Sequence, residues 1–273
     1  MAARDNIAGL VCGFPATLRK RRCLVVLWGY GDESYDDDST YVLAGWLGTA
    51  ENWENFSDEF EEAKLPRSLH MKNDRRPRGA RIQKLANLTL KHSAYRVDCL
   101  LHQGNYRNIV KGKILPELDS PYFVLFYQVI LSAALLADSV GWDGTIDWIF
   151  DEQGKIGTDA NNWYWWIKEH AKPNLKRRLG STPIFRDDKC VLPLKAADLF
   201  AWQIRRHSAL EQPKRTETNQ ILYSFLAKHG VSGKMTGPYL EEFVKSLNTG
   251  MLLKANCQLF LPEDKRPKSG EVF

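Results

Sequence analysis

The amino-acid sequence predicts an α/β fold in which helices flank a mixed β-sheet. Two observations support this: strand-length apolar runs dominate the first part of the chain, and helix-length patterns then alternate with short apolar runs. The expected strands are residues 23–30, 40–47, 94–101, 145–150 and 182–185. The expected helices are residues 50–64, 80–92, 119–140, 159–171, 192–206, 216–228 and 238–249. Antiparallel strands followed by alternating helices and strands are typical of a mixed sheet with helices on its faces.

The first two strands are predicted to form a β-hairpin. Residues 23–30 are a continuous apolar run, which is typical of a central strand covered on both faces. A polar stretch at 36–39 leads into the second apolar run, and this arrangement favours a hairpin over 23–48. Residues 50–64 then carry apolar side chains at helical spacing with glutamates between them, as expected of an amphipathic helix.

Two later helices carry start and stop signals. The long apolar helix is expected to begin at a cap provided by Asp119 or Ser120, with Pro121 in its first turn, and to end at Gly141. The helix at 192–206 has a proline in its first turn, where the missing N–H is no loss. These signals fix where the two most apolar helices start.

Composition and charge narrow the class of protein. The chain has 273 residues and a formal net charge of +5, which permits a nucleic-acid partner without requiring one. Its five cysteines include no C-x-x-C pair, so a zinc ribbon or redox motif is not expected. No apolar run approaches the roughly 20 residues of a membrane helix, and the basic cluster at 19–22 follows the weakly apolar start. We therefore expect a cytoplasmic protein without membrane contact, and the sequence indicates no particular protein partner.

Three acidic segments point to a metal site. Asp32 and Asp151 each follow an apolar strand, and Asp198 lies inside an apolar helix. A buried carboxylate is costly unless it meets a cation or several hydrogen-bond donors. Asp198 therefore either forms a structural ion pair or binds a metal. Asp32 and Asp151 either bind a metal or merely cap turns or pair with arginines. We predict that the three segments meet and bind Mg²⁺ or Mn²⁺, which prefer hard oxygen ligands.

Three further residues are candidates beside those acids. Glu33 and Glu152 follow Asp32 and Asp151 directly, and neighbours on a strand point to opposite faces. Each glutamate is therefore expected to be a ligand, a general base or a surface acid. His70 titrates near neutrality, so it is either a proton carrier or substrate contact, or an ordinary loop or core histidine.

Basic and aromatic segments offer contacts for a polyanion. The segment 75–81 contains four arginines, and Arg205 and Arg206 end the helix at 192–206. Such side chains bind phosphates, although a solvated loop has the same composition. The aromatic cluster at 163–166 is expected mainly in the core, with base stacking as the alternative.

Five short motifs occur in an order that is specific as a set. They are Gly-Asp-Glu-Ser at 31–34, Tyr-Val-Leu-Ala-Gly-Trp at 41–46, Leu-His-Met at 69–71, Phe-Asp-Glu at 150–152 and Leu-Pro-Leu-Lys-Ala-Ala-Asp-Leu-Phe-Ala-Trp at 192–202. Together they resemble the domain of unknown function 3800 family, from about residue 23 to about residue 210. The resemblance implies a ribonuclease H-like fold whose sheet presents acidic residues at one end, as in metal-dependent nucleases.

The resemblance also implies roles for single residues. Asp32 matches the first-strand acid, Asp151 the later-strand acid and Asp198 the acid on the closing helix. Two positions depart from the pattern. Lys195 stands where the family usually has a glutamine, so it either contacts a substrate phosphate or neutralises a carboxylate. Ribonuclease H also has a glutamate on its first long helix, whereas the matching helix of this chain offers only Asp138, near the end of the helix.

The expected organisation follows from the extent of the resemblance. Residues 21–210 form the ribonuclease H-like domain, preceded by an arm at 1–20 that is either flexible or an upstream addition. A helical C-terminal extension at 211–261 and a tail at 262–273 follow. The tail is rich in proline, lysine and glutamate and is expected to be disordered.

The sequence thus predicts a divalent-metal-dependent nuclease that hydrolyses phosphodiester bonds. Two Mg²⁺ ions about 3.5–4 Å apart would stabilise the attacking and leaving oxygens. Two alternatives stay open: a catalytically silent nucleic-acid-binding or regulatory protein that retains the fold, and a hydrolase of small phosphoesters. The candidate metal ligands are Asp32, Asp151 and Asp198. The candidate catalytic residues are these three acids together with Glu33 and Glu152. The candidate substrate contacts are Lys195, His70 and Arg205.

Overall fold

The structure is a computed structural model that describes most of the chain. The described residues are 26–36, 39–71, 79–152, 154, 156–208 and 217–261. The expected arm at 1–20 and tail at 262–273 lie outside the described residues. So do Arg75, Arg76 and Arg78 of the predicted basic segment, whereas Arg81 is described and exposed.

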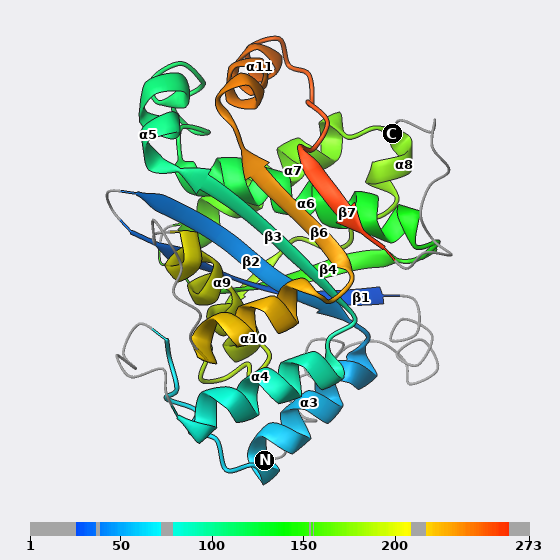
Figure 1. Cartoon of the computed structure of the whole chain (residues 1–273). Coiled ribbons are helices and arrows are strands. Elements are labelled where there is room, and N and C mark those ends of the chain that lie inside the picture. Colours follow the sequence, from blue (N-terminus) through cyan, green and yellow to red (C-terminus); the bar gives the residue numbers. More distant parts are fainter. Residues whose placement is uncertain are drawn as a thin grey trace.

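A seven-stranded mixed sheet forms the centre of the fold (Figure 1). Its strands are β1 (Val26–Tyr35), β2 (Thr40–Gly48), β3 (Tyr95–His102), β4 (Thr145–Asp151), β5 (Ile184–Arg186), β6 (Gly230–Met235) and β7 (Cys257–Phe260). Their order across the sheet is β5-β4-β1-β2-β3-β6-β7. The pairs β1–β4, β4–β5 and β3–β6 are parallel, and the other three pairs are antiparallel. The predicted mixed sheet is confirmed.

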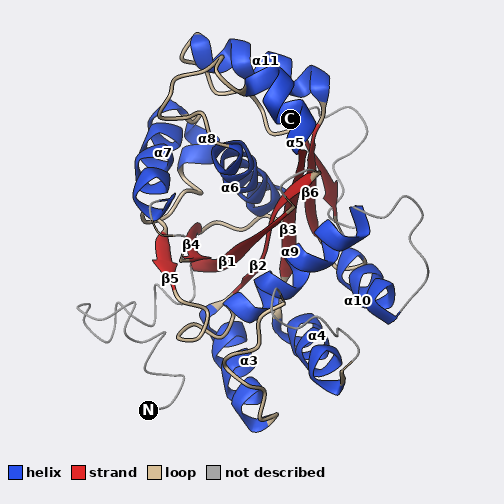
Figure 2. Ribbon diagram, turned by 90° about the vertical axis from the view of Figure 1, so that its left-hand side faces the viewer, coloured by secondary structure: helices blue, strands red, loops and turns tan. Residues whose placement is uncertain are grey.

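Helices cover both faces of the sheet, as predicted (Figure 2). One face carries α3 (Ala50–Glu62), α4 (Ala80–His92), α9 (Leu194–Ser208) and α10 (Glu217–Leu226). The other carries α6 (Pro121–Ser139), α7 (Ile156–His170), α8 (Pro173–Lys176) and α11 (Gly237–Asn248), with the short α5 (Gln103–Asn105) and the π-helical η1 (Tyr106–Val110). Each face has its own hydrophobic core, so the sheet is covered by apolar side chains on both sides.

Side-chain alternation along β1 decides which core each residue enters. Leu27 packs into the core beneath α6, whereas Trp28 and Tyr30 pack into the core beneath α9. Trp53 of α3 is fully buried in this second core, and its Nε1 donates a hydrogen bond to the Trp28 carbonyl oxygen at 3.0 Å. β1 also runs further than expected, so Asp32 lies inside the strand and not after it.

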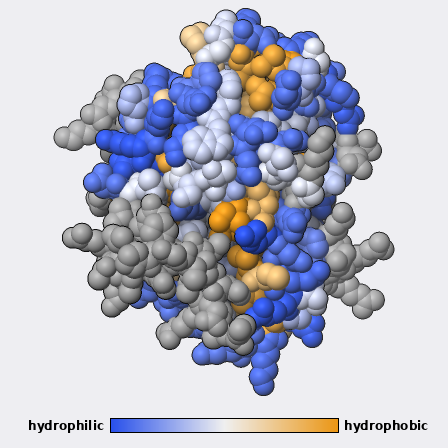
Figure 3. Space-filling model, turned by 180° about the vertical axis from the view of Figure 1, so that it is seen from behind, coloured by the Kyte–Doolittle hydropathy of each residue, from blue (hydrophilic) through white to orange (hydrophobic). Residues whose placement is uncertain are grey.

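The helix α6 is buried on nearly all sides. The Ser120 hydroxyl accepts a hydrogen bond from Tyr122 N–H, and Pro121 occupies the first turn, as predicted. The expectation that no run approaches membrane-spanning length is wrong, since α6 has 19 residues and a mean hydropathy of 1.5 over its most apolar window. However, 83% of that window is buried inside the fold. Seen from behind, the molecule shows mainly hydrophilic side chains around a narrow hydrophobic strip (Figure 3).

The prediction of a purely helical C-terminal extension is wrong for two segments. β6 pairs in parallel with β3, and β7 forms the edge of the sheet beside it. The β6 sequence, Gly-Val-Ser-Gly-Lys-Met, has low strand propensity because glycine and lysine are depleted in strands. Tertiary pairing overrides that propensity: β6 bonds to β3 along Arg96–Leu101, and Val231 and Met235 are fully buried.

The contact between β1 and β2 leaves no room at Gly45. A Cβ there would lie 2.2 Å from the Tyr30 carbonyl oxygen, and that backbone atom cannot rotate away. We expect Gly45→Ala to lower the free energy of unfolding by about 1–3 kcal/mol, because the two strands must move apart. Urea unfolding measures this loss. Gly104→Ala is the matched control, since a Cβ there meets nothing within 4 Å; equal stability of the two variants would contradict the prediction.

Candidate metal centre

Two of the predicted acids lie next to each other on neighbouring parallel strands. Gly31 of β1 is opposite Phe150 of β4, so Asp32 and Asp151 follow at the same level. Neighbouring strands are about 4.8 Å apart. Both side chains point toward α9, because the residues two positions earlier on each strand pack into the core beneath that helix. The register of the sheet therefore brings the two carboxylates together.

The third predicted acid approaches them from α9. Asp198 is buried, and its negative charge raises the pKa of Asp32, so the two carboxylates are neighbours. Its Oδ2 accepts a hydrogen bond from the backbone N–H of Met71 at 2.8 Å. The Nδ1 atom of His70 lies 2.6 Å from the same oxygen. The loop after α3 thus supports Asp198 through one side chain and one peptide group.

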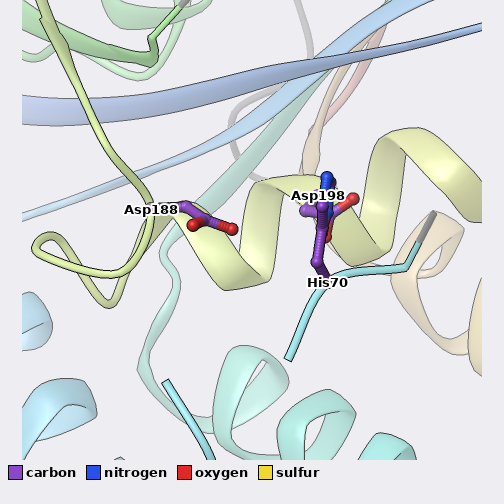
Figure 4. Close-up of side chains that lie close together, drawn as sticks. All are labelled: His70, Asp188 and Asp198. Carbon is purple, nitrogen blue, oxygen red and sulfur yellow. The ribbon is translucent and has the colours of Figure 1, made fainter. Parts of the chain in front are cut away.

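A fourth carboxylate, Asp188, belongs to the same group. Its backbone N–H donates a hydrogen bond to Asp151 Oδ1 at 3.1 Å, and its Oδ2 accepts one from Lys195 Nζ at 2.6 Å. Asp188 is 8% exposed and Lys195 is 1% exposed, so this ion pair is buried. Ligand-type atoms of His70, Asp188 and Asp198 lie within 4.8 Å of one another, and Figure 4 shows these three side chains with Asp198 on α9 and Asp188 on the segment that precedes it.

Asp188 is not among the site residues predicted from the sequence. Its context was informative, because it closely follows an apolar run of strand length, as Asp32 and Asp151 do. The run Asp187-Asp188-Lys189 has the composition of a polar turn, and the side chain of Asp187 is 46% exposed. Only the fold distinguishes the inward-pointing aspartate from its neighbour.

Burial and mutual repulsion raise the pKa values of two of these carboxyl groups, Asp32 and Asp151. Burial is the main cause for Asp32, whose pKa is raised well above its usual range, and the charges of Glu33, Asp198 and Asp151 add to it. Burial, with repulsion from Asp188, raises the pKa of Asp151 to about 6. The hydrogen bond to Asp198 raises the pKa of His70. The centre therefore holds its protons more strongly than isolated side chains do.

A polar pocket of about 430 Å³ opens onto this group. Its lining residues are Ser68, His70, Asp151, Glu152, Gly154, Asp187, Asp188, Lys189 and Lys195. A larger cavity of about 1070 Å³ lies beside β7, but none of the four clustered aspartates lines it. The smaller pocket therefore gives a small polar substrate group access to Asp151 and Asp188.

The remaining candidates lie around the centre in different ways. Glu152 is exposed at the pocket. Glu33 points to the opposite face, where its charge raises the pKa of Tyr122 in the core beneath α6. Arg205 Nε donates a hydrogen bond to Ser34 Oγ at 2.8 Å, near the end of β1. Asp138 is not in the cluster, since its Oδ1 accepts hydrogen bonds from two arginines that follow α8.

The residues of the centre fit a divalent cation. The carboxylate of Asp32 is 3% exposed and accepts a single hydrogen bond among the described residues, from Glu33 N–H at 2.8 Å. The charged neighbours that act on its pKa are all carboxylates. An uncompensated buried charge costs several kcal/mol, and a cation shared by Asp32, Asp151 and Asp198 would remove that cost. Carboxylate oxygens are the ligands that Mg²⁺ and Mn²⁺ prefer.

No protein-family model matches this chain, and no curated protein matches it in sequence. The resemblance to the domain of unknown function 3800 family therefore stays a prediction from the five motifs.

Replacing Asp32 by asparagine tests whether the buried carboxylate meets a cation. Because the folded-state pKa of Asp32 is raised, its ionisation destabilises the metal-free fold as pH rises from about 4 through that pKa. At pH 7.5 without metal, Asp32→Asn should therefore melt at a higher temperature than the parent. With Mn²⁺ at about 100 times its dissociation constant, the parent should gain about 2.7 kcal/mol and the variant almost nothing.

Differential scanning calorimetry with and without Mn²⁺ gives both readings. Asp138→Asn is the matched control: it removes an aspartate that lies outside the cluster, so the shift caused by Mn²⁺ should persist. A full Mn²⁺ shift in Asp32→Asn would show that Asp32 does not hold the ion.

Metal affinity should depend on pH, because a protonated carboxylate is not a ligand. The pKa of Asp151 is raised to about 6, so affinity should rise as pH increases through 6 and fall about tenfold per unit below it if one proton is displaced. Isothermal titration calorimetry in buffers of different ionisation enthalpy counts the protons released. Affinity that is constant between pH 5 and 7 would rule out Asp151 as a ligand.

Proposed function

We propose that this chain is a divalent-metal-dependent hydrolase of phosphodiester bonds and that its substrate is a nucleic acid. The observation that carries this proposal is the convergence of four aspartates, from β1, β4, the segment after β5 and α9, beneath one polar pocket. Rigid secondary structure holds three of them, as precise placement of ligands requires. A ribonuclease H-like fold is part of the same proposal, and the mixed sheet with carboxylates at one end supports it.

The chemistry follows from the side chains around the pocket. Asp32, Asp151 and Asp198 would hold the cation, which when bound lowers the pKa of a bound water and polarises a phosphoryl oxygen. His70 lines the pocket, and its hydrogen bond to Asp198 raises its pKa, which favours the protonated imidazole. Such a proton can be delivered to the leaving oxygen of a phosphodiester. Asp198 thereby both binds the ion and orients the imidazole.

Basic groups near the pocket support a polyanionic substrate. Lys189 lines the pocket and its side chain is 65% exposed, and Arg205 lies near the end of β1. Positive side chains around an acidic centre bind the phosphates that flank the cleaved bond. A small phosphoester needs none of these flanking contacts, so a polymer is the better fit.

One observation favours a second candidate, a catalytically silent nucleic-acid-binding protein. Lys195 already neutralises Asp188, and His70 already pairs with Asp198. In that case the two pairs stabilise the fold, and the chain binds nucleic acid without cleaving it. The two candidates differ in a single measurable property, namely cleavage that requires a divalent ion.

The test compares the parent protein with Asp151→Asn on single-stranded and duplex DNA and RNA and on a model phosphodiester, with Mn²⁺, with Mg²⁺ and with a chelator. We expect metal-dependent cleavage of at least one polymer and a loss of about 100-fold or more in Asp151→Asn, as for removal of one charge-stabilising group. Asp138→Asn should keep its activity. Salt-sensitive binding without cleavage would instead support the silent protein, and turnover of the model substrate alone would indicate a small phosphoester.

A further inference from the structure

Lys195 lies among the carboxylates. It precedes Asp198 by three residues on α9, so both side chains lie on the same side of the helix. Its Nζ is 2.6 Å from Asp188 Oδ2. The side chain is 1% exposed, so the ammonium group cannot swing into solvent without opening the fold.

The lysine occupies the place where a second ion would bind. Under the proposed function the first ion is held by Asp32, Asp151 and Asp198, and the carboxylate of Asp32 accepts a single hydrogen bond among the described residues. The group whose ligand atoms lie within 4.8 Å of one another is His70, Asp188 and Asp198. In that grouping Asp188 Oδ2 is taken by the ammonium, and Asp198 Oδ2 is taken by Met71 N–H and His70.

The charge balance of the centre leads to the same result. Four aspartates carry four negative charges when ionised, and Lys195 contributes one positive charge. One divalent ion leaves a net charge of −1. A second divalent ion would make the centre positive and would lie close to a fixed ammonium group, where like charges repel strongly in a buried site.

We propose that Lys195 replaces the second cation of a two-metal site, so that this centre binds one divalent ion. Lys195 lines the pocket. Its ammonium group supplies to a substrate phosphate the positive charge that the second ion supplies in a two-metal site. The inference rests on the proposed function, because it assumes that the carboxylates bind metal. It adds how many ions they bind and which residue sets that number.

The experiment counts Mn²⁺ ions on the full chain at pH 7.5, by calorimetry and by electron paramagnetic resonance of free and bound Mn²⁺. The parent should bind one ion at this centre without the spin coupling of a paired site. Lys195→Gln, which frees Asp188 and removes the charge, should bind two. Lys189→Gln is the matched control, since it removes a pocket lysine whose ion pair is with Asp187, and it should still bind one.

A second variant keeps the inference testable if Lys195→Gln fails to fold. In Asp188→Asn the number of ions should stay at one, because Asp188 serves the lysine and not the ion. Two ions on the parent, one ion on folded Lys195→Gln, or loss of an ion in Asp188→Asn would each overturn the inference while leaving a metal centre intact. No bound ion on the parent would instead remove the basis of the proposed function.

Discussion

The parallel pairing of β1 with β4 is the constraint on which the rest of the structure depends. It fixes Asp32 and Asp151 one strand spacing apart with their side chains on the same face. Because the sheet is covered on both faces, Asp32 cannot relax into water, and Asp151 is only partly exposed, at the pocket. Two peptide groups offset part of the free-energy cost of burying these charges. The Glu33 N–H donates a hydrogen bond to Asp32, and the Asp188 N–H donates one to Asp151.

Packing holds α9 in the position that completes the centre. Trp46 of β2 is fully buried, and its Nε1 donates a hydrogen bond to the Ala196 carbonyl oxygen at 3.2 Å. The ring of Phe200 packs on Trp46 with centroids 4.7 Å apart. These contacts lie on either side of Asp198 along the helix. The hydrophobic core therefore sets the position of a polar site, and its aromatic residues act on the chemistry through geometry alone.

The sequence was sufficient for the mixed sheet and for the three acids whose context is regular. Asp32 and Asp151 end apolar runs, and Asp198 interrupts an apolar helix face, so each stands out against its neighbours. Two features depended on contacts distant in the chain. Asp188 lies in a polar turn and becomes a site residue only through Lys195 and Asp151. The strand β6 lacks strand propensity and forms only because β3 offers a free edge for pairing.

The hydrogen bond from the Met71 amide to Asp198 connects the centre to a distant part of the sequence. The arginine-rich stretch at 75–81 begins four residues after Met71 along the chain. Under the proposed function, a polyanion bound by those arginines and an ion bound by Asp198 would be linked through this short length of chain. Linkage between two binding equilibria is reciprocal, so each ligand changes the affinity for the other by the same factor. Capture of the polymer and retention of the ion would then be a single cooperative event.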